Sequence, residues 1–146
     1  MMVLRKARCQ RGSATLEFAL IAPLLLAVLF GIGDFGVAMT KQEVLTNAAR
    51  EGARYGIVLQ TPRRTTSQIQ TVVENYLTSA HITSGYTVTI PPAACANTGD
   101  NLSVSVSYPY TIPVLSSLIC PTCLIHAGST FPSSITLQAT TVMKCE

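Results

Sequence analysis

The stretch Arg11–Ala38, RGSATLEFALIAPLLLAVLFGIGDFGVA, decides the fold of this chain. Phe18–Gly33 carries no charged residue, and apolar residues resume after Asp34. Phe18–Val37 is 20 residues long, which as a helix reaches roughly 30 Å, the thickness of the hydrocarbon core of a bilayer. A helix satisfies its own backbone hydrogen bonds in lipid. The stretch therefore predicts a single membrane-spanning helix, with Pro23 early enough for the helix to tolerate it.

Charges on the N-terminal side predict the orientation of this helix. No acidic residue precedes Glu17, whereas four basic residues precede the apolar run: Arg5, Lys6, Arg8 and Arg11. The positive-inside rule keeps such an end in the cytoplasm, so the rest of the chain crosses the membrane. A conventional secretory signal competes with this interpretation, but the apolar run is longer than a usual signal core and no clear A-x-A cleavage site follows. An uncleaved signal anchor stays open.

Glu17 is the one residue that fits poorly, because a carboxylate at the edge of the span is costly unless it reaches the headgroups, is protonated or meets a cation. One interpretation is a carboxylate that snorkels to the headgroups. The other takes account of its surroundings, since a basic leader, Gly12, four residues and then Glu17-Phe18 open the apolar run. This order resembles a class III, type IV pilin-like signal.

That resemblance implies that a membrane prepilin peptidase cuts between Gly12 and Ser13 and leaves the apolar helix on the mature protein. Glu17 then becomes the fifth mature residue. The new α-amino group of Ser13 is a cation in the right place to pair with its carboxylate, in the same chain or in a neighbour.

A wider set of residues resembles the TadE-like family of minor pseudopilins, which belong to the tight-adherence (Flp-type) pilus system. The resemblance covers about Gln10–Tyr55, where Phe18 replaces the tyrosine that often follows the glutamate in pilins of these systems. The features that coincide in order are Gly12, Glu17, Pro23, Asp34-Phe35-Gly36 and Ala48-Ala49-Arg50-Glu51-Gly52-Ala53-Arg54.

The family resemblance implies a structural role in assembling or priming a Flp-type pilus, with no enzymatic activity. The expected partners are the prepilin peptidase, other pilins and pseudopilins, inner-membrane assembly proteins and the lipid bilayer. The expected location is the bacterial inner membrane, with one span and the C-terminal domain outside the cytoplasm. The alternative is a signal-anchored periplasmic binding or adhesion module that never enters a pilus.

Length and charge limit the remaining possibilities. The 146 residues have room for one span and one small domain, so we expect a cytoplasmic leader over 1–12, a transmembrane helix over 13–40 and an exported α+β domain over 41–146. From Ser13 onward there are six basic and seven acidic residues, so the formal charge of +3 comes from the leader. No basic patch with interleaved aromatic residues appears, which argues against nucleic-acid binding.

The helix is expected to continue outward over Lys41–Leu59. Its centre has small residues spaced by four, which would form a smooth ridge along which another backbone can approach closely: Ala48, Ala49, Gly52, Ala53 and Gly56. The ridge could pack on the sheet of its own chain or against a neighbouring subunit.

The remaining elements complete a pilin-like α+β fold. Thr65 and Gln68 form a capping-box pattern, and apolar residues at helical spacing predict an amphipathic helix over about Thr66–Ala80. Alternation predicts strands over 86–90, 102–107 and 135–143, which form a small antiparallel sheet of about three strands. The proline-rich segment Tyr108–Pro132 is expected to be mainly loop.

Four cysteines remain after loss of Cys9 with the leader, all on the exported side, where disulfides persist. In a strand meander, Cys95 and Cys145 lie at one end of the sheet, whereas Cys120 and Cys123 lie at the other. This geometry favours the pairs Cys95–Cys145 and Cys120–Cys123 over the two crossed connectivities.

The C-x-x-C spacing of Cys120 and Cys123 has two other interpretations, a redox motif or a zinc site completed by His126 and Cys95 or Cys145. Surrounding loop and proline residues do not fit a redox motif, and an oxidising compartment disfavours zinc. No nucleophile–base pair or phosphate-binding loop stands out in the sequence. We therefore expect no catalytic residues, no metal and no cofactor.

Overall fold

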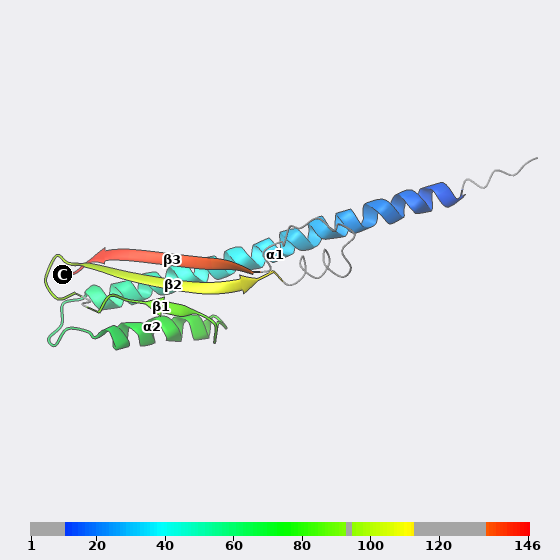
Figure 1. Ribbon diagram of the computed structural model, residues 1–146. Helices are drawn as coiled ribbons and strands as arrows, with labels where there is room; N and C mark the ends of the chain where they lie inside the picture. The colour runs from blue at the N-terminus through cyan, green and yellow to red at the C-terminus, as the bar shows by residue number, and fades with distance from the viewer. Residues whose placement is uncertain (1–10, 93–94, 113–133) are drawn as a thin grey trace, which may run out of the picture.

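The computed structural model describes residues 11–92, 95–112 and 134–146. Two helices and then three strands follow one another along the chain: α1 (Arg11–Ile57), α2 (Thr66–Ser79), β1 (Thr87–Thr89), β2 (Asn101–Thr111) and β3 (Ser134–Lys144). The predicted α+β class, with a long N-terminal apolar helix, a second helix and a small antiparallel sheet, is confirmed. Figure 1 shows the N-terminal half of α1 projecting alone, while α2 and the sheet gather along its C-terminal half.

Helix α1 is 47 residues long and continues through Pro23. An interior proline removes one backbone hydrogen bond, but the long apolar runs on either side keep the chain helical. The Thr40 and Thr46 hydroxyls donate to the carbonyls of Gly36 and Gln42, at 3.0 and 2.8 Å, so these polar groups are satisfied within the helix. The expected continuation of the helix past Lys41 is present and ends at Ile57.

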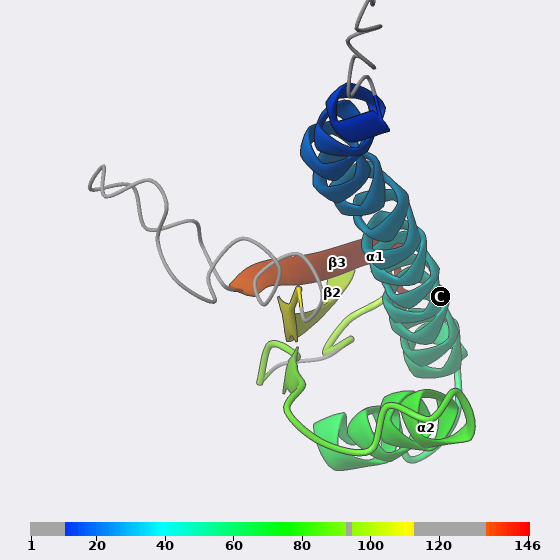
Figure 2. The same cartoon turned by 90° about the vertical axis from the view of Figure 1, so that its right-hand side faces the viewer.

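Helix α2 begins at a complete capping box. The Thr65 hydroxyl accepts from the backbone N–H of Gln68, and the Gln68 side chain accepts from the backbone N–H of Thr65. These two bonds satisfy backbone donors that the first turn of a helix leaves free. Ile69, Val73 and Leu77 are fully buried, so the predicted apolar stripe faces the core. Figure 2 shows α2 beside the C-terminal part of α1.

The sheet has the order β1-β2-β3, and both pairings are antiparallel. The prediction of loop was wrong for Tyr108–Thr111, because β2 extends to Thr111 and pairs with β3 along its whole length. Pro109 is tolerated there because β1 pairs only with Ser105–Ser107, which leaves β2 without that neighbour at the proline. The rest of the predicted loop, Pro113–Pro132, lies outside the described residues.

The two faces of the sheet differ in chemistry. Leu102, Val104 and Val106 are fully buried on the face that α1 and α2 cover. The opposite face is exposed or half-buried and carries mainly hydroxyl side chains. Among them, Ser105 Oγ and Thr140 Oγ1 form a hydrogen bond of 2.9 Å. Period-two alternation along β2 therefore reports correctly which side chains enter the core.

The β2–β3 pair runs along α1, from its C-terminal end towards the apolar half. The backbone N–H of Glu146 donates to the carbonyl of Ile57 at 3.2 Å, at the far end of the domain. Further along, the Gln42 side chain donates to the carbonyl of Gln138 at 2.8 Å. At the other end, the Tyr110 hydroxyl donates to the carbonyl of Asp34 at 3.5 Å. The sheet thus covers α1 down to the edge of its long apolar run.

Candidate membrane and assembly site

The apolar half of α1 is the largest exposed apolar surface that the structure describes. A window of this helix is long and apolar enough to cross a membrane, with none of it buried inside the protein. Large exposed apolar side chains line it as far as Met39: Leu16, Phe18, Leu20, Ile21, Leu24, Leu25, Leu26, Val28, Leu29, Phe30, Ile32, Phe35, Val37 and Met39. Such a surface requires lipid or other apolar partners to cover it.

The residues of the expected leader junction lie at the beginning of α1. Gly12 and Ser13 are in its first turn, and Glu17 is four residues beyond Ser13, one turn along the helix. Glu17 is exposed, and its carboxylate forms no hydrogen bond or ion pair with any residue described by the structure. Residues 1–10, including Cys9, lie outside the described residues.

The small-residue ridge of α1 faces the interior of the same chain. Ala48, Ala49 and Ala53 are fully buried, and Gly52 and Gly56 are buried as well. A Cβ at Gly52 would collide with Cγ2 of Val73 in α2, and one at Gly56 would lie 2.5 Å from Cδ2 of Leu102 in β2. The ridge therefore allows α1 to approach α2 and the sheet closely.

Cys95 and Cys145 form a disulfide that joins the β1–β2 loop to the end of β3. Both residues are almost completely buried in the core. The backbone N–H of Gly99 donates to the carbonyl of Cys145 at 2.8 Å, and the N–H of Cys145 donates to the carbonyl of Asp100 at 2.8 Å. The bridge thus ties the loop and the C-terminal segment together at the end of the domain farthest from the apolar half of α1.

The remaining cysteine predictions fall outside the described residues, which exclude Cys120, Cys123 and His126. The zinc alternative also used Cys95 or Cys145, whose sulfur atoms are bonded to each other in the structure. Within residues 11–92, 95–112 and 134–146, no group of three or more His, Cys, Asp or Glu side chains is arranged to hold a metal ion.

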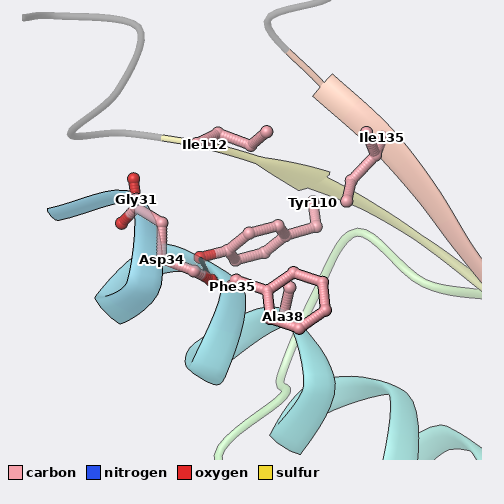
Figure 3. Close-up of a pocket in the computed structure, with 7 residues that line it drawn as sticks. All are labelled: Gly31, Asp34, Phe35, Ala38, Tyr110, Ile112 and Ile135. Carbon is pink, nitrogen blue, oxygen red and sulfur yellow. Dashed lines mark hydrogen bonds between the residues drawn. The ribbon is translucent and has the colours of Figure 1, made fainter. Parts of the chain in front are cut away.

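A cluster that sequence reasoning missed lies where the end of the sheet meets α1 (Figure 3). The Tyr110 ring lies against α1 beside Asp34, and a crevice of about 160 Å³ opens between the helix and the two strands. Lys41 Nζ lies 4.9 Å from the centroid of the Tyr108 ring and 5.9 Å from that of Tyr110, within cation–π range. The crevice is lined by Gly31, Asp34, Phe35, Ala38, Tyr110, Ile112 and Ile135.

This cluster is mainly apolar with a few polar groups. Tyr110 is only 7% exposed, and its burial, followed by the nearby Asp34 carboxylate and Tyr108, raises the pKa of its hydroxyl above the ordinary value. The sequence signal that could have revealed the cluster is the absence of charge from Asn101 to Met143, with two tyrosines near the end of β2.

The fold and these surfaces define an α+β protein whose domain is built along one long helix with a span-length exposed apolar half. Residues 12–54 match the model of the family described as TadE-like protein, which confirms the resemblance over that stretch. The match associates this part of the chain with proteins of the tight-adherence pilus system, a structural rather than an enzymatic family. In the same comparisons, no curated protein and no solved structure matches the chain.

Proposed function

We propose that this protein is a minor pseudopilin that contributes to the assembly or priming of a Flp-type pilus, after a prepilin peptidase cuts behind Gly12. One observation carries the proposal. The family match over residues 12–54 covers both the exposed apolar stretch of α1 and the following part of the helix, which packs against the folded domain. The recognised segment thus includes both an anchor and its attachment to an exported domain.

The apolar half of α1 would serve two environments in turn. In the inner membrane its side chains are covered by lipid tails, with the N-terminus on the cytoplasmic side. In an assembly they would be covered by the helices of other pilins or pseudopilins and of inner-membrane assembly proteins. Burying apolar side chains from water is favourable by about 25 cal/mol per Å², so the helix leaves lipid only when neighbouring helices replace it.

Glu17 would provide the specificity that an apolar helix lacks. An uncompensated carboxylate among apolar side chains is costly, whereas one paired with a cation is much less so. The α-amino group created at Ser13 lies one helical turn away in the same chain. It could pair with Glu17 of the same subunit or of a neighbouring subunit. Pairing between subunits would fix the axial register of one helix relative to the next.

Leader removal gives the direct test of this proposal. We expect mass spectrometry of the membrane-extracted protein to find a chain that begins at Ser13 when the cognate prepilin peptidase is present, and the uncut chain when it is absent. Gly12→Val should keep the leader even with the peptidase, because the larger side chain obstructs the cleavage position. An N-terminus that is intact in both strains would overturn processing and favour the signal-anchored module. A start beyond Ala38 would identify the apolar helix as a discarded signal.

A second prediction concerns Glu17 itself. Glu17→Ala should leave insertion and leader removal unchanged and should strongly reduce the number of assembled pili, because the Ser13 amine loses its partner. The matched control is Glu43→Ala, which removes an exposed carboxylate from the same helix outside the apolar half. The readouts are membrane fractionation and pilus counts by electron microscopy. Undiminished piliation with Glu17→Ala would exclude the pairing role.

A further inference from the structure

The end of the β2–β3 pair lies at the level on α1 where the exposed apolar surface stops. Apolar side chains are exposed on the helix as far as Met39, whereas the exposed side chains between Glu43 and Arg54 are polar or charged. At the end of the sheet, the Tyr110 hydroxyl donates to the carbonyl of Asp34, and Ile135 lines the same crevice as Gly31–Ala38. The sheet therefore overlaps the last turns of the apolar half.

Lengths along the helix place this overlap relative to a bilayer. Phe18–Val37 rises about 30 Å as a helix and fills the hydrocarbon core, so the core ends near Val37. From Arg11 to Lys41 the rise is about 45 Å, which matches a bilayer with its headgroup regions. The segment from Asp34 to Lys41 thus lies at the boundary between the acyl chains and the outer headgroups.

The side chains at this level have the chemistry of a membrane interface. Tyrosine and lysine gather at headgroup depth because each has an apolar body and a polar end. Here Tyr108 and Tyr110 flank Lys41 within cation–π distance, and Ile135 is 37% exposed beside them. No charged residue occurs anywhere from Asn101 to Met143, so the end of the strand pair carries no charge to resist entry into the interface.

We propose that the end of the β2–β3 pair, defined by Tyr108, Tyr110, Ile112 and Ile135, rests in the outer headgroup region of the same bilayer that α1 spans. The partner of the crevice beside Asp34 is then lipid, at the boundary between acyl chains and headgroups. The proposal rests on the membrane span of the proposed function. It also shortens the expected transmembrane segment of 13–40, because the sheet covers its last turns.

Tryptophan fluorescence provides a clean test, because the chain contains no tryptophan. Single tryptophans would replace Ile135 or Ile112 at the end of the strand pair, Val142 at the opposite end of β3, and Leu24 within the span. Val142 is the matched control, since it is an exposed apolar residue of the same strand. Each full-length variant would be checked by circular dichroism and reconstituted in phosphatidylcholine vesicles with bromine either near the headgroups or near the bilayer centre.

We expect Ile135→Trp and Ile112→Trp to lose at least about half of their emission in the shallow-brominated vesicles, since interface residues lie at that depth. Val142→Trp should lose little, and Leu24→Trp should be quenched best by deep bromine. If Leu24→Trp is quenched but both end positions behave like Val142→Trp, the interface contact is refuted and the span stands. Equal quenching of Val142→Trp and Ile135→Trp would refute contact limited to this end. An unquenched Leu24→Trp would refute the span and, with it, the contact.

Discussion

Replacing both Cys95 and Cys145 by alanine is expected to destabilise the folded α+β domain by about 4 kcal/mol. The two cysteines are separated by 50 residues in the sequence, and the chain-entropy model assigns that value to a loop of this length. For a domain of roughly 100 residues, such a loss lowers Tm by roughly 15–30 °C. The measurement is thermal unfolding of the detergent-extracted protein by circular dichroism.

The position of the disulfide predicts where the effect should appear. The bridge lies at the end of the domain where the β1–β2 loop and the C-terminal segment meet, and where Glu146 bonds to Ile57. Hydrogen exchange should therefore accelerate at the amides of Gly99 and Cys145, with little change in the apolar half of α1. The control replaces Cys120 and Cys123 by alanine, because a bridge between cysteines three residues apart would close a far shorter loop. A change in Tm no larger than in the control would contradict the structural role of the Cys95–Cys145 bridge.

Gly52→Ala is the second large effect that we expect. A Cβ at this position would collide with Cγ2 of Val73, and it would also lie 3.7 Å from both Ile69 Cγ2 and Val104 Cγ1. Val73 is β-branched and helical, so its side chain has almost no other rotamer to adopt. The α1–α2 contact must open instead, and overpacking of this kind costs about 1–3 kcal/mol. The same thermal unfolding experiment would show the loss as a lower Tm.

Two comparisons separate overpacking from a general effect of alanine in the helix. Gly36→Ala is the matched control, because a Cβ there meets nothing within 4 Å, so the change brings only the better helix propensity of alanine. In the double variant Gly52→Ala/Val73→Ala, removal of the Val73 methyl groups makes room for the new Cβ. We expect the double variant to be at least about 1 kcal/mol more stable than the sum of the single effects. Additive effects would show that Gly52 and Val73 do not compete for space.

Short-range patterns in the sequence determined the helices and strands of this protein. Phe18–Gly33 is apolar enough to require a helix in lipid, Thr65 and Gln68 begin α2, and alternation along β2 separates core from surface. Each of these signals depends on neighbours within a few residues, and such neighbours are visible without a fold. The family resemblance over the first third of the chain was likewise readable from residue order.

Only the tertiary structure decided which surfaces these elements present to one another. The small-residue ridge fits an internal contact as well as a contact with a second subunit, and the choice depends on Val73 and Leu102, which are distant in sequence from Gly52 and Gly56. The extension of β2 to Thr111 required a partner strand that begins at Ser134, beyond the reach of any local propensity. The meeting of Tyr110 with Asp34 likewise joins residues that are 76 positions apart, because the strand pair runs along the C-terminal half of α1.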